Sequence, residues 1–276
     1  MTPPDTSAPD ETLERKLDAC RDILRDLGRV VVAFSAGVDS TFLLALAVET
    51  LGRENVLAAM GISPSLASAE NEAGRELARK IGAELVEVPT GELDDPNYAA
   101  NPAKRCFYCK HDLFSRLGDL AAERGFAAVL SGANADDTGD FRPGMEAANE
   151  LGVRSPLLEA HLTKADIRTA SKAMALETWD KPAMACLASR VPYGQPITAD
   201  KLSQVERAEA ALSDLGLASR RVRHHGPVAR IEVPAEDLPR AIALRGQIVR
   251  ALKDAGFAYV TLDLQGFRSG SMNEVL

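Results

Sequence analysis

Residues 30–41 read VVVAFSAGVDST, and this stretch decides the fold of the chain. Five consecutive apolar residues lead straight into a short Ser/Gly loop, and an apolar helical pattern follows. An unbroken apolar run bounded by a turn signal is typical of a buried parallel strand. The start of the helix offers backbone N–H groups and the positive end of the helix dipole, which favour an anion. Because Ser35, Ser40 and Thr41 add hydroxyl donors, the stretch predicts an anion-binding strand–loop–helix unit.

The loop has no Gly-Lys-Ser/Thr, as a Walker A loop would, and no GxGxxG, as a dinucleotide-binding loop would. It resembles the pyrophosphate loop (PP-loop) of ATP pyrophosphatases, whose usual form is Ser-Gly-Gly-x-Asp-Ser. The resemblance implies an enzyme that cleaves ATP to AMP and pyrophosphate in order to activate a substrate as its adenylate. The residues that it assigns to the nucleotide are Ser35, Gly37, Val38, Asp39 and Ser40.

One position departs from the PP-loop pattern, because Ala36 stands where the family usually has glycine. If the backbone there needs a positive φ, alanine costs about 1 kcal/mol, whereas in an ordinary backbone region the change is nearly free. A Ser/Gly turn of an unrelated α/β protein is the alternative reading of the loop.

The composition is that of an ordinary globular protein: 276 residues, 46% of them hydrophobic and 26% charged. No apolar run approaches the ~20 residues that a membrane-spanning helix needs. Residues 1–10 are rich in Pro, Ser, Thr and Asp and lack the basic and apolar regions of a signal peptide, so they predict a disordered tail. We therefore expect a cytoplasmic protein without a membrane partner. A net charge of -8 weighs against nucleic acid as the main partner.

Strand and helix signals alternate over most of the chain. We expect a helix at 11–28, a strand at 30–34, a helix to about 51, strand 55–61, helix 68–82, strand 84–88, a helix at 105–124 and strand 127–130. This alternation predicts an α/β fold with a doubly wound parallel sheet, of the adenine nucleotide alpha hydrolase-like type that the PP-loop implies. Ligands of such sheets bind beyond the carboxyl ends of the strands. The resemblance places the backbone of Met60, at the end of the second strand, against adenine.

The pattern changes after residue 195. A helix at 198–215, strands at 220–224 and 228–233, a long helix at 235–255 and a strand at 259–264 are expected. This order predicts a smaller α+β domain over residues 196–276, with its helices packed on a mixed sheet. The PP-loop domain then covers 11–195, and we expect 196–276 to serve substrate binding or oligomerisation.

A second polar loop, SGANADDTGD at 131–140, follows the fourth strand. Because it leaves a carboxyl end of the same parallel sheet, it should face the same crevice as the PP-loop. We expect Gly132 and Asn134 to contact ribose or phosphate and the carboxylate of Asp137 to hold Mg²⁺. The alternative is an Asp-rich surface turn.

Three of the four cysteines are spaced as ligands. Cys106 and Cys109 stand at i and i+3, on one face of a helix, and Cys186 lies far along the chain in an irregular stretch. Three readings compete: a [4Fe–4S] cluster with one open iron, a zinc site completed by His111, and a Cys106–Cys109 redox pair beside a lone nucleophile. The fourth cysteine, Cys20, falls in step with apolar helix positions and is read as a core residue.

Four segments together are similar to the LarE-type sulfur transferases, which act in the biosynthesis of the nickel-pincer nucleotide cofactor. They are the PP-loop, RCFYCK at 105–110, the loop at 131–144 and WDKPAMACLASRVPYG at 179–194. The resemblance implies that ATP adenylates a carboxylate of a pyridinium dicarboxylate mononucleotide and that sulfur then displaces AMP, giving a thiocarboxylate. It also implies a homo-oligomer whose partners are a nucleotide-type small molecule and other enzymes of cofactor biosynthesis.

The resemblance assigns the sulfur-donor position to Cys186. Some members of the family sacrifice this cysteine and are left with dehydroalanine, whereas others hold a [4Fe–4S] cluster whose open iron binds an extra sulfide for transfer. Because Cys106, Cys109 and Cys186 are all present, the cluster form is favoured. ATP, Mg²⁺ and this cluster are the expected cofactors, and Cys186 and Asp39 are the expected catalytic residues.

Further candidate ligands lie near Cys186 and in the C-terminal domain. Ser189 and Arg190 are expected to contact ATP or a substrate phosphate. Arg221 and Arg223, with Arg230, form a basic cluster on two paired strands, and arginine suits bidentate phosphate contact. The alternative for this cluster is a solvated strand face.

Glu206 and Glu232 are candidate metal or substrate ligands, and His224 and His225 are read as turn residues. Three other functions stay open. A tRNA thiolase also uses cysteines, but the acidic charge counts against it. An amide-forming synthetase would not need three cysteines, and a non-catalytic adenine-nucleotide sensor would need neither Asp39 nor the cysteines.

Overall fold

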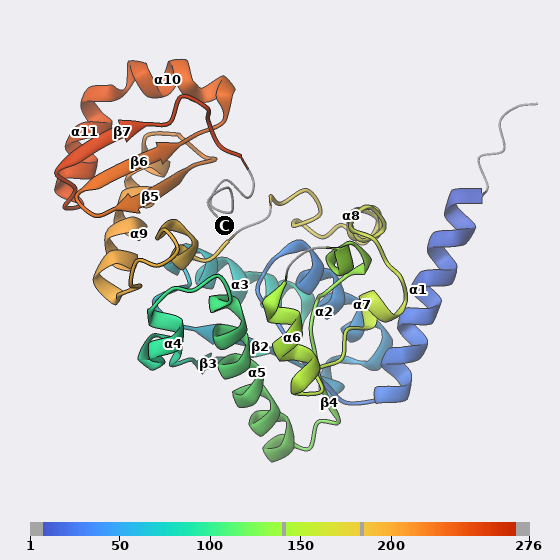
Figure 1. Ribbon diagram of the computed structural model, residues 1–276. Helices are drawn as coiled ribbons and strands as arrows, with labels where there is room; N and C mark the ends of the chain where they lie inside the picture. Colours follow the sequence, from blue (N-terminus) through green and yellow to red (C-terminus); the bar gives the residue numbers. More distant parts are fainter. Residues whose placement is uncertain (1–7, 140–141, 183–184, 269–276) are drawn as a thin grey trace, which may run out of the picture. The chain divides into compact units, whose positions relative to one another are not determined.

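The computed structural model describes residues 8–139, 142–182 and 185–268 (Figure 1). The described chain divides into two compact units. Unit 1 comprises residues 8–63, 68–91 and 106–182, and unit 2 comprises residues 64–67, 92–105 and 185–268.

A four-stranded parallel sheet forms the centre of unit 1. Its strands are β1 (Val30–Ala33), β2 (Val56–Ile62), β3 (Glu84–Pro89) and β4 (Ala128–Leu130). They lie in the order β3-β2-β1-β4. The chain therefore builds outward from β1 to β3 and then returns to place β4 on the other side of β1. The direction of winding reverses between β1 and β4, and ligands of doubly wound sheets bind at such a point.

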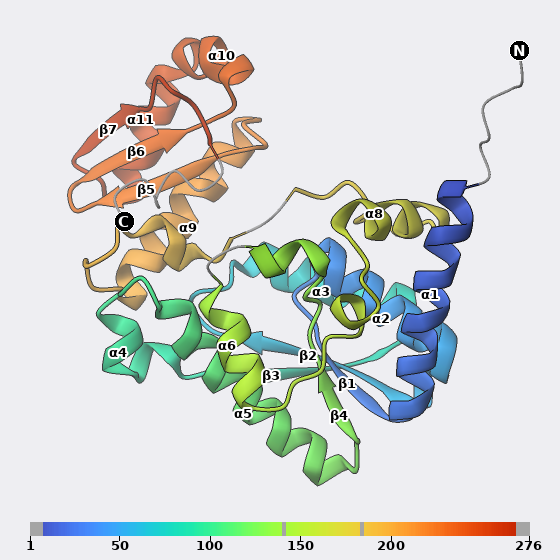
Figure 2. The same cartoon turned by 45° about the vertical axis from the view of Figure 1, so that its right-hand side comes forward.

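Helices cover both faces of this sheet (Figure 2). The helices in this part of the chain are α1 (Ala8–Leu27), α2 (Val38–Leu51), α3 (Ser68–Ile81), α5 (Arg105–Arg124), α6 (Pro143–Glu150), α7 (Pro156–Glu159) and α8 (Lys164–Ala173). Val31 and its strand neighbours Leu57 and Val129 pack against Phe114 and Leu117 of α5. Because strand side chains alternate, Val30 and Val32 serve the opposite face, where α2 packs against β1 and β2. The predicted doubly wound α/β fold is thus confirmed.

The ends of the helices follow local sequence signals. Residues 163–166, Thr-Lys-Ala-Asp, have the pattern of a capping box, and the box forms: the Thr163 hydroxyl accepts the N–H of Asp166, and the Asp166 carboxylate accepts the N–H of Thr163. Gly28 closes α1 in the left-handed conformation, at φ +73°. In the described part of the chain, no helix combines the length and the apolar character needed to cross a membrane.

The expected disordered tail at residues 1–10 is wrong for its last part, because α1 already begins at Ala8. Proline is tolerated in the first turn of a helix, so this composition does not prevent a helix. Residues 1–7 lie outside the described residues.

Unit 2 contains a three-stranded mixed sheet with helices packed on it. Its strands are β5 (Arg221–His225), β6 (Val228–Glu232) and β7 (Tyr259–Leu262), and its longer helices are α9 (Ala199–Asp214), α10 (Leu238–Ala243) and α11 (Arg245–Asp254). β5 and β6 are antiparallel, whereas β6 and β7 are parallel. The expected single helix at 235–255 is two helices that meet at Leu244, just before the weak helix former Gly246.

A buried asparagine joins two segments of unit 2 that are far apart in the sequence. Asn101 follows the short helix α4 (Pro96–Ala99) at φ +57°, and its Nδ2 donates to the carbonyls of Val191, Pro192 and Gln195. Its Oδ1 accepts from Arg105 at 2.5 Å. These contacts make residues 92–105 and the chain from 185 onward one unit. The expected boundary near residue 195 differs from this division, because Arg190 pairs with Glu209 of α9 and Arg223 of β5 donates to the carbonyl of Ser189, which bonds the chain before residue 195 to the elements after it.

Two histidines on β5 make the stability of unit 2 dependent on pH. Burial lowers the pKa of His224 and of His225; Lys201 contributes at His224, and Arg230 and Arg223 contribute at His225. An unfolded chain binds these protons at the ordinary pKa near 6.5, whereas the folded chain resists protonation. Stability is therefore expected to fall as the pH drops below about 6.5.

Urea unfolding at pH 8.0 and pH 5.5 tests this expectation. His224→Gln and His225→Gln should each reduce the loss of stability between the two pH values, because each removes one group that must be protonated on unfolding. Equal losses in the wild type and both variants would contradict it.

Candidate functional site

The PP-loop turns from β1 into α2 and places a helix N-terminus at the carboxyl edge of the sheet. Gly37 is the N-cap residue, with extended backbone and no side-chain cap. The Ser40 hydroxyl lies 3.0 Å from the Ser35 hydroxyl and accepts the N–H of Ser35 at 3.2 Å. Val38 is buried below the first turn, and Ser35 is exposed above it. Hydrogen bonds made by the hydroxyl groups of the PP-loop itself therefore fix its conformation at the start of α2.

Ala36 adopts the left-handed conformation, at φ +55°, so the cost of about 1 kcal/mol for alanine applies. Its side chain is fully buried and faces Gly74 of α3. Its carbonyl accepts a hydrogen bond from Lys181 Nζ at 3.2 Å, and the same ammonium is 2.7 Å from a carboxylate oxygen of Glu70. Packing and a charged donor therefore hold the loop in this conformation.

The loop after β4 lies directly against the first turn of α2. A Cβ added to Gly132 would lie 3.0 Å from the backbone nitrogen of Ser40 and 3.2 Å from the carbonyl carbon of Asp39. An added side chain would require the first turn of α2 to move by a few tenths of an ångström, because these neighbours are backbone atoms. The structure thus brings Gly132 to the PP-loop, whereas Asp140, at the end of the expected second loop, lies outside the described residues.

The polar side chains of this second loop bind largely to the loop itself and to nearby residues. Asp137 accepts the backbone N–H of Asn134 at 2.9 Å, and Asn134 accepts the N–H of Asp136 at 3.0 Å. Asp137 also forms an ion pair with Arg142. Both Asn134 and Asp137 are buried. These contacts fix the conformation of the loop after β4, whose backbone lies beside α2.

Lys164, the first residue of α8, bridges the two loops. Its backbone N–H donates to Asp136 at 2.8 Å, and its ammonium forms an ion pair with Asp39. The other carboxylate oxygen of Asp39 is buried and has no hydrogen-bond partner among the described residues. Asp39 therefore holds one cation and keeps one inward oxygen available for another ligand.

Sequence reasoning missed both lysines of this site, Lys164 and Lys181. Lys164 directly follows the capping residue Thr163, and Lys181 lies in the WDKP stretch. The first stretch reads as a helix start and the second as an irregular loop. Nothing in the spacing of either stretch indicates that its lysine reaches the PP-loop, because the contacting residues Asp39 and Ala36 lie 125 and 145 positions earlier in the chain.

Met60 lies at the carboxyl end of β2, in register with Glu87 of β3. Its side chain is buried and occupies the space left by Gly74. The side chain of Met60 is therefore part of the packing beneath the PP-loop, and a contact with adenine through its backbone stays a prediction.

The cysteines expected to act together belong to two units. Cys106 and Cys109 lie in the first turn of α5, where Cys106 is exposed and Cys109 is half-buried. Cys186 is exposed and belongs to unit 2. Cys20 is buried as expected, and burial raises the pKa of its thiol to about 12. The shared coordination of one metal group by Cys106, Cys109 and Cys186 remains a prediction.

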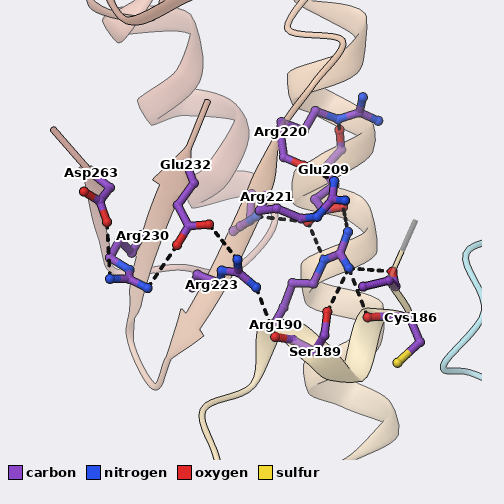
Figure 3. Close-up of polar contacts among 12 residues, drawn as sticks. Cys186, Ser189, Arg190, Glu209, Arg220, Arg221, Arg223, Arg230, Glu232 and Asp263 are labelled. Atoms are coloured by element: carbon purple, nitrogen blue, oxygen red, sulfur yellow. Dashed lines mark hydrogen bonds and ion pairs between the residues drawn. The ribbon is translucent and has the colours of Figure 1, made fainter. Parts of the chain in front are cut away.

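Arg190, four residues after Cys186, is 1% exposed (Figure 3). Its Nε and Nη2 atoms pair with the two carboxylate oxygens of Glu209, at 2.8 and 3.0 Å. Its Nη1 donates to backbone carbonyls in the Cys186 segment and to the hydroxyl of Ser189. The guanidinium that was expected to contact phosphate is thus surrounded by protein acceptors.

The arginines of the paired strands are also matched with carboxylates. Arg223 Nη2 lies 2.6 Å from one oxygen of Glu232, and Arg230 lies 3.0 Å from the other. Glu232 is buried, so its charge is compensated by these two guanidinium groups. Arg223 also donates to the carbonyl of Ser189 at 3.1 Å.

Arg221 carries the most strongly perturbed charge of this cluster. It is 8% exposed, and burial, together with the neighbouring charge of Arg190, lowers its pKa to about 10. Its guanidinium lies 5.1 Å from the centre of the Phe267 ring. An added anion would relieve the repulsion between these cations.

Glu206 is half-buried on α9. Within residues 8–139, 142–182 and 185–268, no three or more His, Cys, Asp or Glu side chains gather as a metal site. Among the residues in these ranges, Glu206 and Glu232 therefore belong to no group of three or more such side chains.

Comparisons with known proteins agree with this arrangement. The chain is 44% identical over 266 residues to an uncharacterised protein of Synechocystis sp., covering 96% of this chain and 99% of that one. It is 41% identical over 265 residues to the pyridinium-3,5-bisthiocarboxylic acid mononucleotide synthase of Lactiplantibacillus plantarum, covering 96% of each. A glutamine-dependent NAD(+) synthetase of Aquifex aeolicus is 37% identical over 75 residues, which is 26% of this chain and 13% of that protein. No family model matches.

The parallel sheet, the loop at its switch point and the helix N-terminus behind that loop define an α/β protein of the PP-loop class. The full-length relationships narrow this class. The chain belongs to the LarE-type family, that of the pyridinium-3,5-bisthiocarboxylic acid mononucleotide synthase. The family resemblance seen in the sequence is confirmed, whereas the likeness to the glutamine-dependent NAD(+) synthetase is confined to about a quarter of the chain.

Replacing Gly132 by alanine tests the contact between the loops. The new Cβ would push against the backbone at Ser40, so we expect ATP to bind about tenfold or more weakly, because the anion site shifts. Gly118→Ala is the control, since Gly118 lies in α5 with no atom within 4 Å of the added carbon. Calorimetric ATP titration of both variants makes the measurement, and wild-type affinity in Gly132→Ala would contradict the assignment.

Proposed function

We propose that this protein is an ATP-dependent sulfur-inserting enzyme that converts a carboxylate of a pyridinium dicarboxylate mononucleotide to a thiocarboxylate. The observation that carries the proposal is the 41% identity, over 96% of both chains, to a protein named as the synthase of the bisthiocarboxylic acid mononucleotide. The PP-loop and the exposed Cys186 supply the two chemical functions that such a reaction requires.

The first step is activation of the carboxylate. A carboxylate oxygen attacks the α-phosphorus of ATP, the bond to the bridging oxygen breaks, and pyrophosphate leaves. The N-terminus of α2 and the hydroxyls of Ser35 and Ser40 bind the phosphates, and Lys181 adds a cation beside the loop. Gly132 allows the loop after β4 to lie against the same helix turn, where Asn134 shapes it. Met60 would contribute its backbone to adenine binding.

Mg²⁺ fits this site through Asp39. A buried carboxylate oxygen without a hydrogen-bond partner in the described residues is the ligand type that Mg²⁺ prefers. Asp137, by contrast, accepts the N–H of Asn134 and forms an ion pair with Arg142, so we assign it primarily a structural role in the loop. When bound, Mg²⁺ would stabilise charge that develops on the phosphates.

The second step replaces AMP by sulfur. A sulfur nucleophile attacks the carboxyl carbon of the adenylate, and AMP departs with the carbon–oxygen electron pair. If the nucleophile is the thiolate of Cys186, the product is first a thioester. Loss of the Cα proton and cleavage of the Cβ–S bond then release the thiocarboxylate and leave dehydroalanine at position 186.

A [4Fe–4S] cluster fits the donor set of this chain. Cys106 and Cys109 present thiols from one helical turn at accessible positions, and Cys186 is an exposed third thiol. Within unit 2, Asn101 ties Arg105, the residue before Cys106, to the segment after Cys186. When bound, the cluster would supply sulfide in place of the cysteine's own sulfur. Zinc would need a fourth ligand.

The substrate phosphate is assigned to the arginine cluster of unit 2. Arg221 is buried among like charges, and Arg223 is oriented by Glu232, so both gain from a bound anion. In this proposal the enzyme is a cytoplasmic homo-oligomer, as the family resemblance implies, and passes its product to other enzymes of cofactor biosynthesis.

The products of the nucleotide half-reaction test the mechanism. Incubation with ATP, Mg²⁺ and the carboxylated mononucleotide should release AMP and pyrophosphate, because attack occurs at the α-phosphorus. Chromatography of the nucleotides distinguishes AMP from ADP. Release of ADP would overturn the adenylation step.

Anaerobic reconstitution with iron and sulfide tests the cluster. We expect broad visible charge-transfer absorbance that is lost in Cys106→Ala, Cys109→Ala and Cys186→Ala, whereas Cys20→Ala, a buried position, should keep it. If the wild type binds no iron and mass spectrometry finds dehydroalanine at position 186 after turnover, the sacrificial mechanism is correct instead.

A further inference from the structure

A buried ion pair lies directly behind the thiol-bearing segment of unit 2. Arg190 and Glu209 form two parallel N–H···O contacts, and Arg190 is among the largest fully buried side chains (Figure 3). Removing two charges from water is costly, so such a pair needs good geometry and further hydrogen bonds to be retained. Here the further bonds lead to the segment that carries Cys186.

The remaining nitrogen of the guanidinium binds the backbone on both sides of the thiol-bearing residue. Arg190 Nη1 donates to the carbonyl of Ala185 at 2.6 Å and to the carbonyl of Cys186 at 3.0 Å. It also donates to the Ser189 hydroxyl at 3.0 Å. Cys186 is the N-cap residue of the short turn Leu187–Arg190, so these bonds fix the carbonyl from which the turn begins.

The carboxylate partner is itself anchored to the sheet of unit 2. Glu209 projects from α9, and its Oε1 accepts the backbone N–H of Val222 on β5 at 2.9 Å. On the other side of the turn, Leu187 is buried and donates its N–H to the carbonyl of Ser65. The backbone of the turn is thus held between two anchors, whereas the Cys186 side chain is exposed.

We propose that Arg190 and Glu209 are positioning residues, which hold the backbone of Cys186 so that its sulfur is presented for transfer. Arg190 then acts through Cys186 and does not bind a nucleotide or substrate phosphate itself. The role of Cys186 as a sulfur donor rests on the proposed function, whereas the hydrogen bonds that fix its backbone do not depend on that function.

The key variant is the double substitution Arg190→Met with Glu209→Leu. Replacing both members of a buried ion pair by apolar residues of similar volume is often tolerated, whereas removing one leaves an uncompensated charge. The double variant should fold but lack the guanidinium that donates to the carbonyls of Ala185 and Cys186. Glu209→Gln is the single comparison. Glu159→Gln is the control, because it weakens the bidentate Arg154–Glu159 pair of unit 1.

Two readouts need no turnover. Hydrogen exchange of the amides of Ser189 and Val191, which bond within the turn, should accelerate by about tenfold or more in the double variant and stay unchanged in the control. The alkylation rate of Cys186 by iodoacetamide, measured by peptide mass spectrometry, should change relative to Cys106 and Cys109. Cys20 is the unreactive internal reference.

A third readout separates positioning from phosphate binding. The double variant should form AMP from ATP and substrate with the wild-type KM for ATP, while the rate of thiocarboxylate formation falls by about tenfold or more. A raised KM for ATP or for the mononucleotide, with unchanged exchange and alkylation, would overturn the proposal in favour of a phosphate ligand. If the wild type makes no AMP, the proposed function fails, and the exchange and alkylation results still decide the positioning role.

Discussion

The close approach of two backbones, at Gly132 and at the first turn of α2, is the constraint on which the candidate nucleotide site depends. The strand order reverses between β1 and β4, the position at which doubly wound sheets bind ligands, and the loops after these two strands lie against each other there. A side chain at position 132 would meet backbone atoms, which cannot rotate away. The same approach lets Lys164 contact both loops, through Asp136 and Asp39.

Both units arrange their cations in the same way, although the protein carries a net charge of -8. Lys181 is paired with Glu70 beside the PP-loop, and Arg223 is paired with Glu232 in the sheet of unit 2. A carboxylate beside a cation fixes its direction and limits repulsion from neighbouring cations before any anion is bound. In the proposed function, the positive charge that meets phosphates is local and preorganised, so the net negative charge of the protein does not exclude anionic ligands.

At Ala36, the conformational strain of the backbone is compensated by packing of the side chain. The left-handed backbone is unfavourable for alanine by about 1 kcal/mol, and glycine would avoid that cost. The methyl group, however, is fully buried against α3, at the place where Gly74 leaves room for it. Burial of a methyl group recovers about 0.8 kcal/mol, which is close to the strain. The strain of alanine, in place of the glycine that is usual in the family, is thus nearly offset by the burial of its methyl group.

The sequence by itself determined the parallel sheet, the PP-loop, the helix start at Thr163 and the family, because each rests on residues that are neighbours in the chain. Strand periodicity, caps and loop motifs are local, and their physical causes act over a few residues. The tertiary structure decided what side chains far apart in sequence do to one another. Arg190 reads as a phosphate ligand beside Cys186, but burial against Glu209 turns it toward the backbone carbonyls. Lys181 donates to the carbonyl of Ala36, and Asn101 donates to the carbonyl of Val191, although the residues of each pair are far apart in the sequence. These contacts form because packing and the need to satisfy buried polar groups act through space.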